Sequence, residues 1–366
     1  MELRSFHELS NYTNIYSLST FDIKSKRGCV INTCKNVHRL WCSKEGEVKL
    51  VKLNFPRIYA DTEILGNAGM CWKSMLVTCI ICRNRNNTFS MNLYIRRADD
   101  VTGMTEHSFA QDLDFVPYKV YMRDLDDELI IFLGGSDCRL HLYKADFEYL
   151  SPVVSGPLES LTRDDELIQH QAPVMAMHTQ RNITFILIGI ACQNGDTKLL
   201  KYSHNKQWNK EASWHVILDG PISGLLLFKL EAGISDLLVA SAVGYAVVYR
   251  DVAQEGLARK NIIPCTQDAI TCVVTSDIDF DGQREIILGT YNQTVCCYKL
   301  KGNVFELIWS KTFPQPIMSI CELDINRDGI FELIVVTMYG ISVFSPDFEA
   351  ALEKLRNIKN SLDKAI

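Results

Sequence analysis

The chain has 366 residues, of which 47% are hydrophobic and 22% are charged, and its formal net charge is −6. This composition is typical of a soluble globular protein, and the length allows two or three ordinary domains or one large repeat-built domain. An acidic balance disfavours nucleic-acid binding, because neutralising phosphates requires a basic surface. No apolar run reaches the roughly 18 residues that a membrane span requires, and the opening residues lack the layout of a signal peptide. We therefore expect a cytoplasmic protein without a membrane span.

Short β-rich runs separated by turns dominate the chain up to residue 345. Several runs share one layout, which is a short strand, a polar loop and a hairpin that ends in an aromatic residue. The first strands align on Ile15, Ile64, Val120, Val174, Ile222, Ile270 and Ile317, and the hairpins close on Trp41, Tyr94, Tyr143, Tyr202, Tyr249, Tyr298 and Phe344. A strand-only repeat of about 50 residues is typical of a β-propeller. We therefore predict an all-β protein with one seven-bladed β-propeller over residues 1–345.

The last repeat differs from the others because no outer strand follows its hairpin. The segment "ELRSFHEL", residues 2–9, precedes the first repeat and is free to supply that strand. Such a closure joins the two ends of the ring and covers an exposed sheet edge. The Trp-Asp and Gly-His pairs of WD40 blades are absent from the sequence, so we expect a different propeller family.

Two loops, each between the first and second strands of a repeat, concentrate acidic side chains. They read "DIDFDGQRE" at residues 277–285 and "DINRDGIFE" at residues 324–332. Oxygen ligands at positions one, three, five and nine can surround a hard cation, and glycine at position six permits the sharp turn. The layout resembles the FG-GAP repeat of integrin-type propellers. That resemblance implies calcium ligands at Asp277, Asp279, Asp281 and Glu285, and at Asp324, Asn326, Asp328 and Glu332.

A second interpretation of the acidic loops needs no metal. Asp and Asn side chains in turns form hydrogen bonds with nearby backbone amides, and Arg284 and Arg327 offset part of the acidity. Both interpretations stay open. No nucleophile elbow, P-loop or dinucleotide fingerprint appears, so we predict no catalytic residues, although carboxylates from distant blades could still converge on the central channel.

The C-terminal segment, residues 346–366, differs in kind from the repeats. "SPD" at its start is a favourable helix N-terminus. An apolar stripe at helical spacing follows, formed by Phe348, Leu352, Leu355, Ile358 and Leu362. We predict an amphipathic helix whose stripe packs either on the propeller or on a partner protein.

Several successive repeats resemble the kaptin family. The resemblance is densest in "ILDGPISGLLLF" and in "TSDIDFDGQREIILGTYNQTVCCYKLKG", and it extends to "LNFPRIYADTEI". It implies a non-enzymatic adaptor of the KICSTOR complex, which holds the GATOR inhibitory complex at the lysosomal surface when amino acids or glucose are short. Target-of-rapamycin kinase signalling is thereby lowered. The implied partners are a second FG-GAP-repeat propeller subunit and a large scaffold.

Two other functions remain open at this stage. The kaptin family was also described as associated with actin filaments at motile cell edges, which implies actin as an alternative partner and location. A hydrolase that uses the central channel of the propeller is the alternative from a different class. That enzyme would need clustered acids or a metal in the channel, whereas an adaptor would offer an apolar surface outside it.

Overall fold

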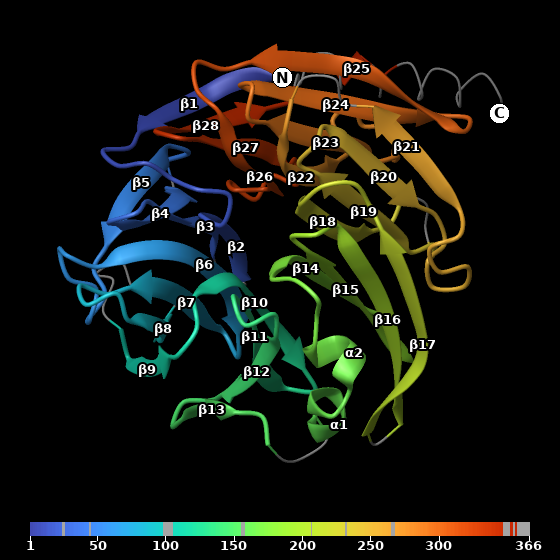
Figure 1. Ribbon diagram of the computed structural model, residues 1–366. Helices are drawn as coiled ribbons and strands as arrows, with labels where there is room; N and C mark the ends of the chain where they lie inside the picture. Colours follow the sequence, from blue (N-terminus) through green and yellow to red (C-terminus); the bar gives the residue numbers. More distant parts are fainter. Residues whose placement is uncertain are drawn as a thin grey trace.

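The computed structural model describes residues 1–23, 26–43, 45–97, 105–154, 158–205, 207–230, 233–264 and 268–346, together with residues 352, 353 and 356. Its strands form seven four-stranded sheets that stand as blades around a central axis (Figure 1). The predicted all-β, seven-bladed propeller is therefore confirmed. None of the helices in the described part of the chain has the length and apolarity to cross a membrane.

Each blade is an antiparallel sheet whose first strand lies nearest the axis. In order from the axis outward, the first three blades are β2 (Leu18–Ile23), β3 (Lys26–Asn32), β4 (Val37–Cys42) and β5 (Val48–Leu53); β6 (Glu63–Trp72), β7 (Met75–Arg83), β8 (Phe89–Arg97) and β9 (His107–Leu113); and β10 (Pro117–Leu125), β11 (Glu128–Gly135), β12 (Leu140–Ala145) and β13 (Leu150–Pro152). The first strands of neighbouring blades contact one another, so together they form the wall of the central channel.

The remaining blades follow the same order. They are β14 (Val174–Arg181), β15 (Phe185–Cys192), β16 (Asp196–Asn205) and β17 (Gln207–Ile217); β18 (Ile222–Phe228), β19 (Asp236–Ser241), β20 (Tyr245–Tyr249) and β21 (Lys260–Pro264); β22 (Ile270–Ser276), β23 (Glu285–Thr290), β24 (Thr294–Lys301) and β25 (Val304–Thr312); and β26 (Ile317–Leu323), β27 (Glu332–Thr337), β28 (Gly340–Ser345) and β1 (Glu2–Glu8). The predicted hairpin-closing aromatics all lie on third strands.

The N-terminal strand completes the seventh blade, as the sequence predicts. β1 runs antiparallel to β28, with Glu2 opposite Ser345 and Glu8 opposite Gly340. Beyond the strand, the N–H of Thr13 donates to the carbonyl of Met338 at 2.9 Å. Figure 1 shows this junction, where the blue first strand lies beside the red last hairpin. The first and last strands of the propeller are thus hydrogen-bonded in one sheet.

Six of the seven innermost strands contain a register shift near their start, where one residue has no partner. The shift follows Ile64, Pro117, Val174, Ile222, Ile270 and Ile317. Two of the predicted anchors need correction. In the third blade Pro117 occupies the position that the sequence alignment gave to Val120, because a proline without an N–H does not resemble the β-branched anchors. Ile15 lies in a turn three residues before β2 begins at Leu18.

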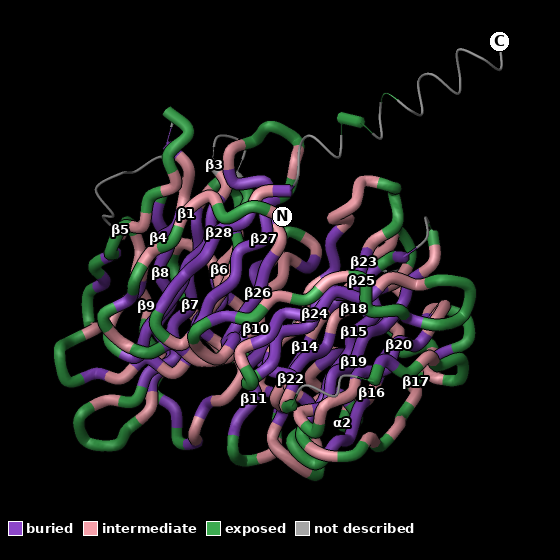
Figure 2. The backbone as a smooth tube through the Cα atoms, turned by 90° about the horizontal axis from the view of Figure 1, so that it is seen from above, coloured by how far each residue is buried: buried purple, intermediate pink, exposed green. Residues whose placement is uncertain are grey.

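The core lies between neighbouring blades rather than at the centre of the ring. Second strands such as β19, β23 and β27 are buried along their whole length, since each is covered by a blade on both faces (Figure 2). One cluster joins Ile287 of the sixth blade to Leu333 of the seventh. Another joins the last blade to the first, where the sulfur atoms of Cys29 and Cys321 lie 3.6 Å apart. Apolar burial of about 2 kcal/mol per large side chain holds each pair of blades together.

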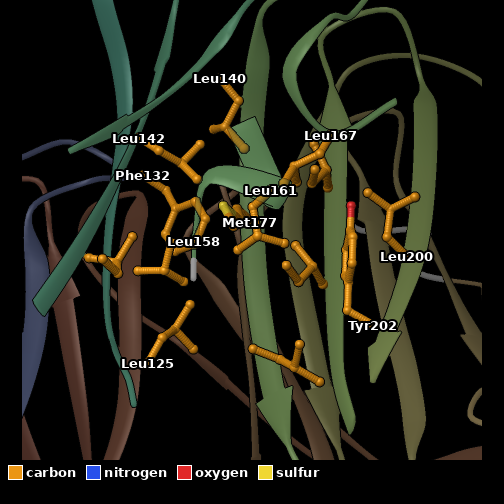
Figure 3. Packing of buried hydrophobic residues seen from close by; sticks show 14 of the residues in the cluster. Leu125, Phe132, Leu140, Leu142, Leu158, Leu161, Leu167, Met177, Leu200 and Tyr202 are labelled. Atoms are coloured by element: carbon orange, nitrogen blue, oxygen red, sulfur yellow. The ribbon is translucent and has the colours of Figure 1, made fainter. Parts of the chain in front are cut away.

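Two short helices that the sequence does not reveal lie between the third and fourth blades. They are α1 (Glu159–Thr162) and α2 (Asp165–Ile168), and at four residues each they are too short to show helical periodicity. The Asp164 carboxylate caps α2 by accepting the N–H of Glu166 at 3.0 Å. Figure 3 shows the side chains that enter the cluster between the two blades, Leu158, Leu161 and Leu167. The helices therefore fill the gap between these blades with apolar side chains.

Candidate functional site

The first acidic loop connects β22 to β23 at one end of the sixth blade. Carboxylate oxygens of Asp277, Asp279 and Glu285 lie within 4.8 Å of one another, so three of the four predicted ligands converge. Gly282 has φ +86°, which is the backbone conformation that the sequence predicts for the turn. The turn at Gly282 and the approach of three acids to one another therefore agree with the spacing in the sequence.

The ammonium group of Lys299, from β24, lies among these carboxylates. Its Nζ is 2.7 Å from Asp279 Oδ2, 2.6 Å from Asp281 Oδ2 and 2.9 Å from Glu285 Oε1. Burial alone would lower the pKa of Lys299, but its hydrogen bonds to the three acids raise that pKa above the usual value. The lysine is therefore charged at neutral pH and compensates the charge of the loop.

Backbone amides donate to several other carboxylate oxygens of this loop. The Asp277 carboxylate accepts the N–H groups of Gly282 at 2.9 Å and Asp281 at 3.2 Å. Glu285 Oε2 accepts the N–H of Ile278 at 2.9 Å. These are the contacts of the metal-free interpretation, and Lys299 adds the charge that a cation would otherwise supply. With Lys299 in this place the residues do not fit a resident cation, because the ammonium and a metal ion would compete for the same oxygens.

The second acidic loop, between β26 and β27, is neutralised in a different way. Arg27 of β3 donates to Asp324 Oδ2 at 2.6 Å, and Arg4 of β1 donates to Glu332 Oε1 at 2.6 Å. Glu332 also accepts the N–H of Ile325 at 3.0 Å. Burial raises the pKa of Glu332, whereas its backbone hydrogen bond and Arg4 lower it. Guanidinium groups from both sides of the ring closure thus converge on the last blade.

The two other predicted members of the second loop face each other. Asn326 Nδ2 donates to Asp328 Oδ2 at 2.7 Å, and the N–H of Asp328 donates to Asn326 Oδ1 at 3.1 Å. Among the described residues, the second loop has no group of three acids that approach one another as those of the first loop do. Calcium binding therefore stays an untested prediction at both loops, disfavoured by Lys299 at the first and opposed by Arg4 and Arg27 at the second.

The two arginines of the acidic loops contact neighbouring blades. Arg284 donates to the Thr275 carbonyl at 2.6 Å and forms an ion pair with Glu322 of the seventh blade. Arg327 Nη2 lies 3.4 Å from Asp22 Oδ1 of the first blade. Arg284 and Arg327 therefore link blades, whereas the cations that lie on the predicted ligands are Lys299 of the same blade and the distant Arg4 and Arg27.

The central channel is a cavity of about 320 Å³ whose wall comes from the first strands of the blades. Among the described residues that line it there is no aspartate or glutamate. Lys119 and His178 are the basic side chains among the described residues of this wall. The clustered acids that a channel hydrolase would need are not found in this part of the structure.

The predicted apolar stripe of the C-terminal segment is described at one position. Leu352 is helical and 51% exposed. Its described neighbours Glu353 and Arg356 are also helical and exposed. Phe348, Leu355, Ile358 and Leu362 lie outside the described residues. The amphipathic helix and its docking role remain predictions from the sequence.

The fold and the two loops define a seven-bladed β-propeller with FG-GAP-type acidic loops that its own cationic side chains neutralise. The chain belongs to the family of KICSTOR complex protein kaptin, whose model matches residues 2–356. A curated relative from Mus musculus, KICSTOR complex protein kaptin, is 28% identical over 285 residues, which cover 70% of this chain. The match spans 65% of the length of that relative.

Solved structures with little sequence similarity share the fold. A chain from the crystal structure of BBS1N in complex with ARL6DN has a TM-score of 0.61 at 11% identity, and the match covers 94% of this chain and 96% of that chain. A chain from the crystal structure of the mitotic checkpoint complex has a TM-score of 0.63 at 9% identity, with 94% and 92% covered. At such identities the likeness concerns the propeller fold alone.

Proposed function

We propose that this chain is a non-enzymatic adaptor subunit of a KICSTOR-like complex. The observation that carries the proposal is the match to the kaptin family, which extends over residues 2–356 and therefore over all seven blades. In this role the protein is cytoplasmic and recruited to the lysosomal surface. It joins a second propeller subunit and a large scaffold, helps to recruit the GATOR inhibitory complex, and restrains target-of-rapamycin kinase signalling when amino acids or glucose are short.

The outer strand of the sixth blade offers a surface for such a partner. On β25 the side chains of Val304, Leu307 and Ile308 are 64%, 50% and 39% exposed. In the described structure β25 pairs with β24 on one side and with no strand on the other. An open edge with apolar side chains favours the addition of a strand from another protein. We therefore place the contact with the second propeller subunit at β25.

The experiment compares two variants of equal charge change. The chain is expressed with a tag in its own cells as wild type, as Leu307→Asp and as Ile183→Asp, and the subunits that co-purify are quantified by mass spectrometry. Ile183 is a matched control because it is 102% exposed and lies in the β14–β15 loop of the fourth blade. We expect Leu307→Asp to reduce recovery of the second propeller subunit at least tenfold, and Ile183→Asp to leave recovery unchanged.

The opposite results separate the parts of the proposal. Equal recovery with both variants would remove β25 as the contact. Failure of the wild-type chain to recover any KICSTOR-like subunit would contradict the adaptor function itself. Filamentous actin recovered in their place would favour the actin-associated alternative.

No observation in the described structure favours the two alternative functions. A hydrolase would need an acid or a metal in the channel, and the described wall contains neither aspartate nor glutamate. An actin-binding surface would be basic, whereas the chain has a formal net charge of −6. The adaptor function is therefore the one we carry forward.

A further inference from the structure

The central channel contains a small set of hydrogen-bond donors that the protein itself does not use. Most of the other polar side chains of its wall are paired within the chain. Asn67 donates to the Ser17 carbonyl at 2.8 Å and to Asn32 Oδ1 at 2.6 Å. Thr271 donates to the carbonyl of Ile317 at 2.6 Å. The internal pairing of these groups leaves them little capacity to bind a ligand.

Other hydroxyl groups of the wall are paired in the same way. Ser319 donates to the carbonyl of Ile15 at 3.3 Å, and Ser223 donates to the carbonyl of Ala240 at 3.3 Å. The hydroxyl of Tyr121 shares a hydrogen bond of 3.1 Å with Thr179. What the channel can offer to a ligand therefore depends on the remaining polar groups.

Lys119 is the most important of these groups. It projects from β10 into the channel, where its Nζ lies 5.2 Å from the centre of the Tyr16 ring. No carboxylate or carbonyl of the described residues lies within hydrogen-bond or ion-pair distance of this ammonium. Burial lowers the pKa of Lys119 to about 8, and no nearby acid opposes that effect. The group is nevertheless mostly protonated at neutral pH, so it is a positive charge without an anion.

Two further donors lie on the same wall. His178 Nδ1 accepts the N–H of Leu227 at 3.3 Å, which leaves the proton of the neutral ring on Nε2. Burial, together with the charges of Arg123 and Lys119, lowers the pKa of His178 to about 4, so the ring is neutral at physiological pH. The Tyr16 hydroxyl contacts the sulfur of Met175 at 3.9 Å, which is a weak acceptor. Lys119, His178 and Tyr16 can therefore each donate a hydrogen bond to a ligand.

We propose that the central channel binds a small organic anion, with Lys119 as its charged contact and with His178 and Tyr16 as neutral donors. A ligand that accepts hydrogen bonds and carries negative charge complements this set. Apolar side chains form the rest of the wall, including Met122, Met177, Leu225 and Val273, and they suit an aliphatic body. The volume of about 320 Å³ is at the lower end of ordinary small-molecule sites. A carboxylate or phosphate group with a short apolar chain fits both features.

The test uses probes that differ in charge at nearly constant shape. Hexanoate, its neutral counterpart hexanamide, and inorganic phosphate are titrated into the full chain by isothermal calorimetry and by thermal unfolding. We expect saturable binding of hexanoate, with a rise in the unfolding midpoint, and no effect of hexanamide. Binding of phosphate as well as hexanoate would show that charge dominates recognition, whereas phosphate binding alone would overturn the organic character of the ligand.

Variants establish that the response comes from the channel. Lys119→Met should weaken hexanoate binding at least tenfold, because a charge-assisted hydrogen bond is lost. It should also keep or raise the unfolding midpoint without ligand, because a desolvated charge is removed. Lys260→Met, on the exposed surface of β21, is the control and should bind as the wild type does. Equal binding by Lys119→Met, or no saturable binding of any anion by the wild type, would overturn the proposal.

Discussion

Arg4 and Glu332 form an ion pair across the closure of the ring, with Arg4 Nη1 at 2.6 Å from Glu332 Oε1. Arg4 belongs to the first strand of the chain and Glu332 to the last blade, so 328 residues separate the partners. Arg4 also donates to the carbonyl of Gly46 at 3.0 Å, and it therefore contacts the first blade too. The pair holds the N-terminal strand at the junction between the first and last blades.

Arg4→Met should destabilise the propeller at this junction. The side chain of Glu332 is 1% exposed, so its carboxylate would lose its cationic partner in a buried place. We expect a loss of about 2 kcal/mol in the free energy of unfolding, less than for a fully buried pair because Arg4 is partly exposed. Urea denaturation measures the change. The control is Arg97→Met, whose ion pair with Glu106 is exposed and should contribute about 0.5 kcal/mol or less.

Lys299→Met should be more disruptive, because one ammonium serves three acids in the first acidic loop. The side chain of Glu285 is fully buried, and removal of its partner leaves an uncompensated charge. We expect a loss of about 3 kcal/mol in urea denaturation. Lys301→Met, two residues further along β24, removes an exposed pair with Glu306 and is the matched control. Similar losses in the two variants would mean that Lys299 does not neutralise the loop.

The effect of Lys299→Met should depend on pH. Burial raises the pKa of Glu285, and Lys299 lowers it in the wild type, so the variant should have a still higher pKa at Glu285 in the folded state. A carboxyl group whose pKa is raised by folding stabilises the fold while it is protonated, and this stabilisation is lost as the pH rises through the folded pKa. The gap in stability between wild type and variant should therefore be small near pH 5 and grow toward pH 8. A gap that is constant over this range, in denaturation series at several pH values, would refute the explanation.

Calcium should have little effect on the wild-type protein. Because the Lys299 ammonium lies among the oxygens that a cation would need, we expect the unfolding midpoint to change by less than about 1 °C between calcium and a chelator. Lys299→Met frees those oxygens, and calcium should raise its midpoint measurably. A rise in the wild type that Asp279→Ala abolishes would instead support calcium as the natural occupant of the loop.

Deletion of residues 346–366 separates the two predicted roles of the C-terminal segment. If its apolar stripe binds a partner, co-purification of the KICSTOR-like subunits should fall while the unfolding midpoint of the propeller is unchanged. If the stripe packs on the propeller, the midpoint should fall and subunit recovery should follow it. Thermal unfolding of the purified deletion variant, measured beside the co-purification, distinguishes the two results.

Much of the fold was predictable because repeats make their pattern visible several times over. The anchors at Ile222, Ile270 and Ile317 begin innermost strands as predicted, and the N-terminal segment pairs with the last hairpin. The errors occurred where one blade departs from the others, as at Pro117, where the bulge is preceded by a residue that lacks an N–H. The short helices α1 and α2 have no periodic signal at four residues each.

The acidic loops show the limit of local sequence. Spacing predicted that Asp277, Asp279, Asp281 and Glu285 converge within nine residues, and all but Asp281 do so. It could not reveal Arg4 or Arg27 at the second loop, since those side chains arrive from strands about 300 residues away along the chain. Lys299 is nearer in sequence, but its approach depends on the pairing of β23 with β24.

The most direct test of the proposed adaptor function is the activity of the target-of-rapamycin kinase after amino-acid withdrawal in cells that lack this chain. The experiment uses cells of the organism that encodes the protein, with and without the wild-type chain restored. Phosphorylation of the kinase substrates is followed over time after amino acids are withdrawn. The adaptor function predicts that phosphorylation persists in the deficient cells and falls normally after restoration. A normal fall of phosphorylation in the deficient cells would contradict the proposed function.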